Sequence, residues 1–202
     1  MPVVDLSFKV RGGTIPLDHG YQLFSAVSRV LPHIHNLPKV GIHPIKGVRI
    51  EPRVLSLNDS SKLTLRIDSE TIGDYLPLAG SEIDLNRHLV SIGVPSIFPL
   101  TPSANLAARM VTLKGMTTSD VFLESVKRAM SELHVQGNPE VVNHLSDDLT
   151  PNPVRRVLRI QARTIVGFAL RITGLSAEES LRLQENGLGG RRHMGCGIFI
   201  PY

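Results

Sequence analysis

Apolar and polar positions alternate along the first residues of the chain and predict a strand. In MPVVDLSFKV the apolar residues fall at about every second position, the period of a half-buried strand, and Gly12 and Gly13 end it. From Leu17 to Leu31 the apolar residues recur at helical spacing, and Pro32 ends this predicted helix. Further strands are predicted near 48–55, 62–67, 82–86 and 89–93, with a short helix near 69–76. The predicted order in this half is strand, helix, strand, strand, helix, strand.

The second half of the chain predicts the same order of elements. Strands are predicted at Leu106–Lys114, Val154–Arg163, Ile165–Thr173 and Ile198–Ile200, and a helix at Thr118–Leu133. Ser176 and Glu179 form a capping box that opens a second helix, and the stretch 137–153 is expected to connect elements. Two copies of one order predict an α+β fold of two tandem ferredoxin-like (βαββαβ) units. We place their boundary between an N-terminal domain, 1–103, and a C-terminal domain, 104–202.

Composition limits the class of protein. Hydrophobic residues make up 42% of the chain and charged residues 20%, as in ordinary folded proteins. No apolar run approaches the roughly 18 residues that a membrane span needs, so we expect a cytoplasmic protein with no membrane partner. The one cysteine, Cys196, excludes a disulfide framework and a cysteine-based zinc site.

Positive charge is concentrated near the C-terminal end. Residues 152–202 carry eight arginines against three glutamates, whereas residues 1–151 carry 14 lysines and arginines against 15 acidic residues. The planar guanidinium group suits phosphates and base edges better than the point charge of lysine does. The excess therefore favours nucleic acid as a partner, and a solubilising basic face is the alternative.

A glycine-rich segment, residues 186–197, lies in this basic region. Glycine permits positive φ and close approach of the backbone, and consecutive amide groups can form an anion-binding nest. Arg191, Arg192 and His193 add cationic donors at its centre. The segment follows a helix and not a strand, so it does not fit a nucleotide-binding phosphate loop, and a connecting turn is the alternative. The glycines expected to contact a ligand are Gly187, Gly189, Gly190, Gly195 and Gly197.

The predicted strand Val154–Arg163 carries a second basic feature. A period of two would place Arg155, Arg159 and Arg163 on one face, together with Gln161. Such a face suits a phosphate backbone. Aromatic residues make up only 4% of the chain and tryptophan is absent, so base stacking is not expected to dominate binding.

Three histidines, His33, His35 and His43, lie in one predicted loop together with Lys39. Histidine exchanges protons near neutral pH, so the loop is a candidate for acid/base chemistry. The loop contains no carboxylate, which weakens a metal-site interpretation, and we expect neither a metal nor a cofactor. A solvated loop with incidental histidines is the alternative. The role of His19, at the start of the first helix, stays open.

The ending GLGGRRHMGCGIFIPY resembles the glycine-rich signature of the CRISPR-associated repeat-processing endoribonucleases, which belong to the RAMP superfamily. The resemblance also covers the first helix and the loop from His33 to Lys46, and tandem ferredoxin-like units are the fold of that family. It is closest to the smaller members found in myxobacterial-type and cyanobacterial systems. Between about 55 and 150 only the order of elements matches.

The resemblance implies a metal-independent endoribonuclease that cleaves CRISPR repeat RNA, the precursor of crRNA. Attack by a 2′-hydroxyl would leave a 2′,3′-cyclic phosphate and a 5′-hydroxyl. His35 is the first choice for the general acid or base, and His33 is the alternative because it stands six residues before Lys39. His43 would be a second proton-transfer group, and Lys39 would stabilise charge on the phosphate. For the tyrosine that many members use, Tyr21 is the candidate nearby.

The same resemblance implies partners. A hairpin of the repeat RNA would be held by the glycine-rich segment and the arginine strand, and subunits of a Cascade-like effector complex are further candidates. Two other functions stay open: a non-catalytic scaffold of the same superfamily that binds repeat RNA, and a ferredoxin-like regulatory domain that binds a small molecule. A metallohydrolase is disfavoured because the histidine loop has no carboxylate.

Overall fold

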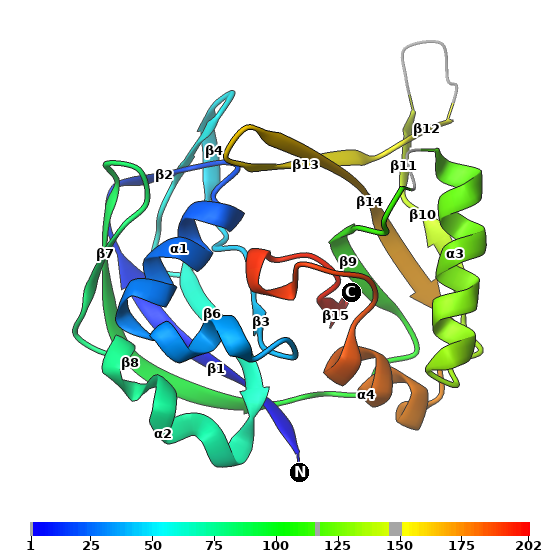
Figure 1. The fold of residues 1–202 in the computed structure, drawn as a ribbon, viewed down its shortest axis with the longest axis horizontal. Coiled ribbons are helices and arrows are strands. Elements are labelled where there is room, and N and C mark those ends of the chain that lie inside the picture. Colours follow the sequence, from blue (N-terminus) through cyan, green and yellow to red (C-terminus); the bar gives the residue numbers. More distant parts are fainter. Residues whose placement is uncertain (1, 116–117, 146–150) are drawn as a thin grey trace. The chain divides into compact units, whose positions relative to one another are not determined.

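The chain divides into two compact units, Met1–Leu100 and Thr101–Tyr202 (Figure 1). The computed structural model describes residues 2–115, 118–145 and 151–202. Each unit mixes helices with an antiparallel sheet and has its own hydrophobic core.

The first unit is built on a five-stranded sheet of order β3-β6-β1-β8-β7. Its strands are β1 (Val3–Arg11), β3 (Gly41–Ile42), β6 (Lys62–Asp68), β7 (Glu82–Asp84) and β8 (Leu89–Pro99). The helices are α1 (Gly20–Val30), α2 (Ile72–Tyr75) and three short 3-10 turns, η1 (Pro32–Asn36), η2 (Ser69–Thr71) and η3 (Leu76–Leu78). A small second sheet contains β2 (Thr14–Pro16), β5 (Val54–Ser56) and β4 (Val48–Glu51), in that order. Without the edge strand β7, the main sheet has the strand order of a ferredoxin-like unit.

The core of this unit is formed by the apolar residues that alternate along β1 and by those that recur at helical spacing on α1. Leu6 and Phe8 of β1 are fully buried, and α1 packs Leu23 and Val27 onto the same cluster. Figure 1 shows α1 covering one face of the sheet. The opposite side of α1 is therefore left for other contacts.

The second unit repeats the arrangement with a sheet of order β10-β14-β9-β15. Its strands are β9 (Leu106–Val111), β10 (Asn138–Val141), β14 (Arg163–Thr173) and β15 (Phe199–Pro201). A further strand, β13 (Arg155–Ile160), pairs with the first half of β14, residues 163–168. A separate pair is formed by β11 (Asn143–Leu145) and β12 (Pro151–Pro153). The helices are α3 (Ser119–Glu132), α4 (Ala177–Asn186) and the turn η4 (Arg192–Met194). The predicted α+β fold of tandem ferredoxin-like units is confirmed.

Several predicted boundaries in the first unit were wrong. The strand expected at 48–55 is a hairpin, because the chain turns between β4 and β5. The first helix begins at Gly20 and not at Leu17, which directly follows β2 and donates its N–H to the carbonyl of Arg53 (2.8 Å). The last predicted strand of this unit is longer than expected, since β8 runs to Pro99 along β1.

Two predictions for the second unit also need correction. The stretch 137–153 was expected to be a connection, but it contains β10, β11 and β12, while residues 146–150 lie outside the described part. The strand expected at Val154–Arg163 ends at Ile160, because Gln161 adopts a positive φ of 52° and turns the chain into β14. The capping box of α4 is confirmed: Ser176 Oγ accepts from the Glu179 N–H, and the Glu179 carboxylate accepts from the Ser176 N–H.

The buried His19 has a structural role. Its Nδ1 lies 2.7 Å from the Pro16 carbonyl oxygen, and its Nε2 accepts a hydrogen bond from the Ile45 N–H (3.0 Å). Nδ1 therefore carries the proton, and both ring nitrogens are satisfied by the backbone. His19 ties the start of α1 to the segment that follows β3.

Candidate functional site

The loop after α1 separates its two neighbouring histidines. Ile34, in the middle of η1, is fully buried, whereas His33 and His35 on either side of it are exposed. The His33 ring lies edge-on to Tyr75, with ring centroids 5.8 Å apart, and the His35 ring lies edge-on to Phe24 at 4.9 Å. The two histidines therefore contact different elements. Within residues 2–115, 118–145 and 151–202, no three His, Cys, Asp or Glu side chains gather in a way that would hold a metal ion.

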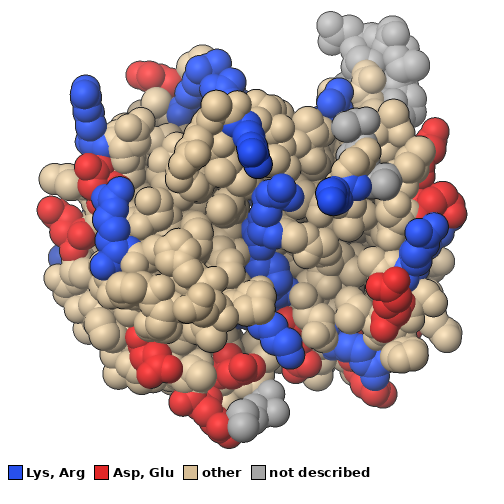
Figure 2. All heavy atoms as spheres, viewed as in Figure 1, with Lys and Arg blue, Asp and Glu red and all other residues tan. Residues whose placement is uncertain are grey.

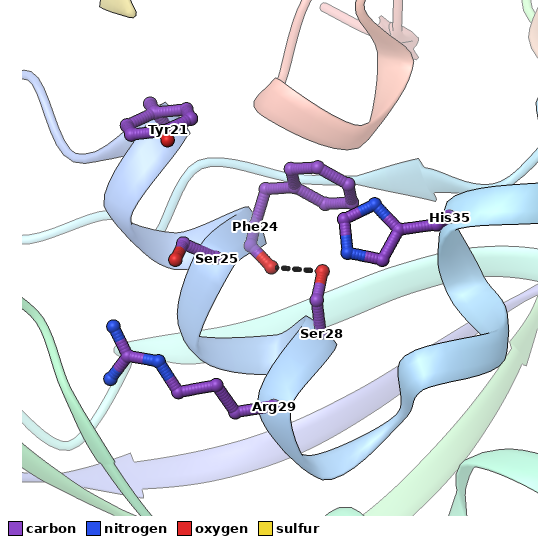
Figure 3. A pocket seen from close by; sticks show the side chains of 6 residues that line it. All are labelled: Tyr21, Phe24, Ser25, Ser28, Arg29 and His35. Carbon is purple, nitrogen blue, oxygen red and sulfur yellow. Dashed lines mark hydrogen bonds between the residues drawn. The ribbon is translucent and has the colours of Figure 1, made fainter. Parts of the chain in front are cut away.

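A pocket of about 240 Å³ lies between His35 and the outward side of α1 (Figure 3). Tyr21, Ser25 and Ser28 line it because they stand four and three residues apart and share a helix face. Figure 3 shows the Phe24 and His35 rings next to each other, with the Arg29 guanidinium farther along the helix. His35 and Tyr21, both singled out in the sequence, therefore share a pocket.

The pocket also contains three residues that sequence analysis missed: Ser25, Ser28 and Arg29. Ser28 Oγ donates to the Phe24 carbonyl at 2.7 Å, so its hydroxyl is held along the helix. Helical spacing from Tyr21 was the signal that could have found these residues, because a helix that buries one side presents the other as a group.

The other two catalytic candidates lie outside this pocket. Lys39 is exposed in the loop before β3. His43 follows β3 and its Nε2 lies 3.5 Å from Asp5 Oδ1, with 16% of the histidine side chain exposed. The structure therefore brings only His35 of the four candidates to the pocket.

Asp5 is bound by a buried arginine as well as by His43. Arg66 Nε and Nη2 donate to its two carboxylate oxygens at 2.8 and 2.9 Å, and only 1% of the Arg66 side chain is exposed. Burial alone would raise the pKa of Asp5, but the hydrogen bonds and charges of Arg66 and His43 outweigh it and hold the pKa well below its usual range. Sequence analysis missed this pair, because the two residues are 61 positions apart.

The glycine-rich segment packs its backbone against β9. Gly197 N–H donates to the Met110 carbonyl (2.8 Å) and Gly190 N–H to the Thr112 carbonyl (3.2 Å). A Cβ on Gly189 would collide with the Thr112 carbonyl oxygen, and one on Gly197 with the Leu188 carbonyl oxygen. Positive φ, which favours glycine, occurs at Gly187, Gly189, Gly195 and Gly197.

The expected anion-binding nest is not formed by most of these amides. The N–H groups of Gly187, Gly190, Gly195 and Gly197 all donate to backbone carbonyls of the second unit. These amides serve the fold and are not available to an anion. Any ligand contact of the segment must therefore come mainly from its side chains and from exposed positions such as Gly190, whose Cβ position is open.

The three cationic residues of this segment differ in exposure. Arg191 is exposed and His193 is half-buried, whereas Arg192 is only 5% exposed and its guanidinium lies against Gly187. Burial makes Arg192 part of the packing of the segment. Arg191 is the cation of the three most accessible to a ligand.

The three arginines that were predicted to share a strand face are exposed in the β13–β14 hairpin, but they do not all lie on one face. Arg155 and Arg159 lie on one face, as expected from a period of two. Arg163 stands opposite Ile160 across the hairpin and so lies on the other face. On the side drawn in Figure 2, the acidic side chains of this unit (red) lie over α3 and α4. The side chains over β13 are basic (blue) or uncharged (tan).

The fold of this chain, with its two ferredoxin-like units in tandem, is similar to that of solved structures. A Cas6-related protein from Pyrococcus furiosus matches with a TM-score of 0.69 at 15% identity, covering 98% of this chain and 97% of that one. A structure described as a RAMP protein binding different RNA substrates also gives 0.69, at 16% identity and 98% coverage of both chains. These matches show the fold.

Sequence comparison gives the family. The Cas6 Crispr family model matches residues 4–202. The CRISPR-associated endonuclease Cas6 of Myxococcus xanthus (strain DK1622) is 41% identical over 201 residues, which cover 100% of this chain and 82% of that protein. The chain belongs to the Cas6 family. In the parts that the structure describes, no helix is long and apolar enough to cross a membrane.

The packing of the glycine-rich segment predicts a large effect on stability at one glycine and almost none at the next. Gly189→Ala should lower the free energy of unfolding by about 1–3 kcal/mol, because alanine would meet the Thr112 carbonyl at a positive φ. Gly190→Ala, the matched control, should change it by less than about 0.5 kcal/mol, because its Cβ has no neighbour within 4 Å. Chemical denaturation of both variants checks this. Equal stability of the two variants would contradict the described packing.

The Asp5–Arg66 pair predicts a pH-dependent loss of stability. Asp5→Asn should cost about 3–5 kcal/mol at pH 7, because it leaves the buried Arg66 without its carboxylate. The folded pKa of Asp5 is depressed, so its contribution is complete above the ordinary value of 3.8 and fades as pH falls toward the folded value. The difference between wild type and variant, measured by denaturation, should shrink below pH 3.8. Asp59→Asn, at an exposed turn, is the control, and a pH-independent difference would be evidence against this pair.

Proposed function

We propose that this protein is an endoribonuclease that cleaves CRISPR repeat RNA. The observation that carries the proposal is the full-length match, at 41% identity, to a protein named a CRISPR-associated endonuclease. The fold and the basic second unit are consistent with an RNA partner. The proposal places the reaction in the cytoplasm, where an RNA transcript is available.

The chemistry proposed is transesterification within the RNA, without a metal ion or cofactor. The 2′-oxygen forms a bond to the adjacent phosphorus while the bond from phosphorus to the 5′-oxygen breaks. One group takes the 2′ proton and another gives a proton to the 5′-oxygen, leaving a 2′,3′-cyclic phosphate and a 5′-hydroxyl. Each acid/base group can contribute about 10²–10⁴-fold to the rate.

Among the histidines, we assign the role of general acid or base to His35. It is exposed, it lines a pocket, and Tyr21 and Arg29 lie in the same pocket. These neighbours supply a hydroxyl and a fixed positive charge, which suit a reacting phosphate. His33 is the alternative.

His43 and Lys39 remain proposals for the other roles. His43 Nε2 lies 3.5 Å from Asp5 Oδ1, and we propose His43 as the second proton-transfer group. Lys39 is exposed and would contribute positive charge. Neither lines the pocket that His35 lines.

For RNA binding we propose the exposed arginines of the second unit. Arg155 and Arg159 share one face of β13, Arg163 at the start of β14 lies on the other face of the sheet, and Arg191 is exposed on the glycine-rich segment. They suit the phosphates of a repeat hairpin. Subunits of a Cascade-like effector complex are the further partners that this function implies.

His35→Ala should slow cleavage of a repeat hairpin about 10²–10⁴-fold and leave RNA affinity unchanged, because it removes a proton-transfer group and no charge contact. Single-turnover rates in EDTA, with a 2′-deoxy substitution at the cut as a chemical control, measure this. His33→Ala is the matched variant and should keep most of the activity.

Other outcomes of this experiment are equally informative. Loss of activity in His33→Ala alone would move the assignment to His33. Tight binding by the wild type with no cut would favour the non-catalytic scaffold. Cleavage that requires added metal would overturn the mechanism.

Arg155→Ala and Arg191→Ala should weaken RNA binding to a similar extent for every RNA sequence, because phosphate contacts carry no sequence information. Each should lower the slope of log affinity against log salt by about one. Arg128→Ala, which removes the same charge from an exposed site on α3, should leave the slope unchanged. Equal effects of all three variants would show that net charge, and not these positions, governs binding.

A further inference from the structure

The hairpin that joins β7 to β8 carries an arginine at a position that favours glycine. Asn86 and Arg87 form its tip, and both have a positive φ, 61° and 70°. The Leu85 N–H donates to the His88 carbonyl oxygen at 2.9 Å and closes the turn. Hairpin turns with two successive positive φ angles prefer Asn followed by Gly, because most side chains are strained there. Asn86 fits this preference and Arg87 does not.

The side chain of Arg87 adds no contact to the fold that would offset the strain. It is exposed, and within the described residues its guanidinium makes no hydrogen bond, ion pair or ring contact. The backbone N–H of Arg87 donates to Asp84 Oδ1 at 2.6 Å, a bond that a glycine would make equally well. A strained residue whose side chain the fold does not use points to a function outside the fold.

The turn holds the base of this side chain in place. On one side Asp84 accepts the Arg87 N–H, and on the other His88 Nδ1 lies 2.9 Å from Thr14 Oγ1 of β2. A guanidinium carried by a fixed turn needs little backbone ordering when it binds a ligand. All of its N–H donors remain available to that ligand.

Arg191 shows the same combination in the second unit. Five non-glycine residues of the described part have a positive φ, and Arg87 and Arg191 are the two arginines among them. Arg191 is also exposed, with no side-chain contact to other described residues, and we have already proposed that it binds RNA. Arginines that serve the fold differ, because Arg66 and Arg182 lie in regular elements and bind carboxylates.

We propose that Arg87 contacts a phosphate of the repeat RNA and gives the first unit a binding position of its own. The planar guanidinium matches two phosphate oxygens at once. A phosphate contact fixes the position of the strand without reading its sequence. This rests on the proposed function and extends RNA binding from the second unit to the tip of the β7–β8 hairpin.

Arg87→Gly separates binding from stability, because the two should change in opposite directions. Glycine relieves the strain, so the midpoint of thermal unfolding should rise by about 2–4 °C. RNA affinity should fall about three- to tenfold at low salt, and the slope of log affinity against log salt should fall by about one. Affinity is measured with a repeat hairpin that carries a 2′-deoxy nucleotide at the cut, so that cleavage does not interfere.

Two variants of the same turn are the matched controls. Asn86→Gly relieves strain but keeps the guanidinium, so it should bind RNA with the affinity and salt slope of the wild type. Arg87→Lys keeps the positive charge and should keep the salt slope. Unchanged affinity and slope in Arg87→Gly would overturn the proposal and leave the guanidinium for a partner other than RNA. A loss of affinity in Asn86→Gly as large as that in Arg87→Gly would also contradict it, because the shape of the turn would then govern binding.

Cleavage of the unmodified hairpin separates failure of this proposal from failure of the proposed function. With limiting protein, Arg87→Gly should cut more slowly than the wild type, and excess protein should restore the rate. If both cut equally well with limiting protein, the proposal falls and the endoribonuclease function stands. A wild type that binds the RNA without cutting it would overturn the endoribonuclease function, while the affinities still decide on Arg87. A wild type that binds no repeat RNA would overturn both.

Discussion

The second unit depends on a close contact between two stretches of backbone. The glycine-rich segment lies against β9 with hydrogen bonds to Met110 and Thr112, and a Cβ at Gly189 or Gly197 would strike a carbonyl oxygen. Backbones can meet this closely only where side chains are absent. The segment leads from α4 to β15, the edge strand that pairs with β9, so the contact also fixes the end of the ferredoxin-like sheet.

This contact changes how a glycine-rich signature should be understood. Glycines followed by cations favour an anion-binding loop, yet four of the five glycine amides are used within the fold. The glycines position the segment, so a ligand would meet mainly its exposed side chains. Arg192 shows the distinction, because it has the residue type of a binding group and the burial of a packing group.

Local patterns predicted the fold well where the information is local. The order of elements, the capping box at Ser176 and the core-facing residues of β1 are all readable from short windows of sequence. The stretch 137–153 was missed because its strands contain proline and asparagine, which are rare in strands, and β10 pairs with the distant β14. Gln161 was missed because its positive φ comes from the hairpin and not from residue type.

The candidate site was predictable only in part, because most of its contacts are not encoded in short windows of sequence. His35 and Tyr21 were named as candidates from the family resemblance, but the pocket that both line is a property of helix geometry. The Asp5–Arg66 pair has no local signal at all, since strand register alone sets Asp5 opposite Arg66. The misplacement of Arg163 was a register error, because a turn of two residues carries a side chain to the other face.

The two histidines of the H-x-H sequence illustrate how one buried residue can divide a motif. Neighbouring positions on a tight helix point in different directions, and the buried Ile34 between them leaves His33 beside Tyr75 and His35 beside Phe24. A joint role, such as two ligands of one metal ion or an acid/base pair on one phosphate, would require Ile34 to leave the core. Burying an isoleucine contributes about 1.5–3 kcal/mol, so the arrangement is stable. Of the two histidines, only His35 lines the pocket, so in the proposed mechanism the second proton-transfer group would come from another part of the chain or from the RNA.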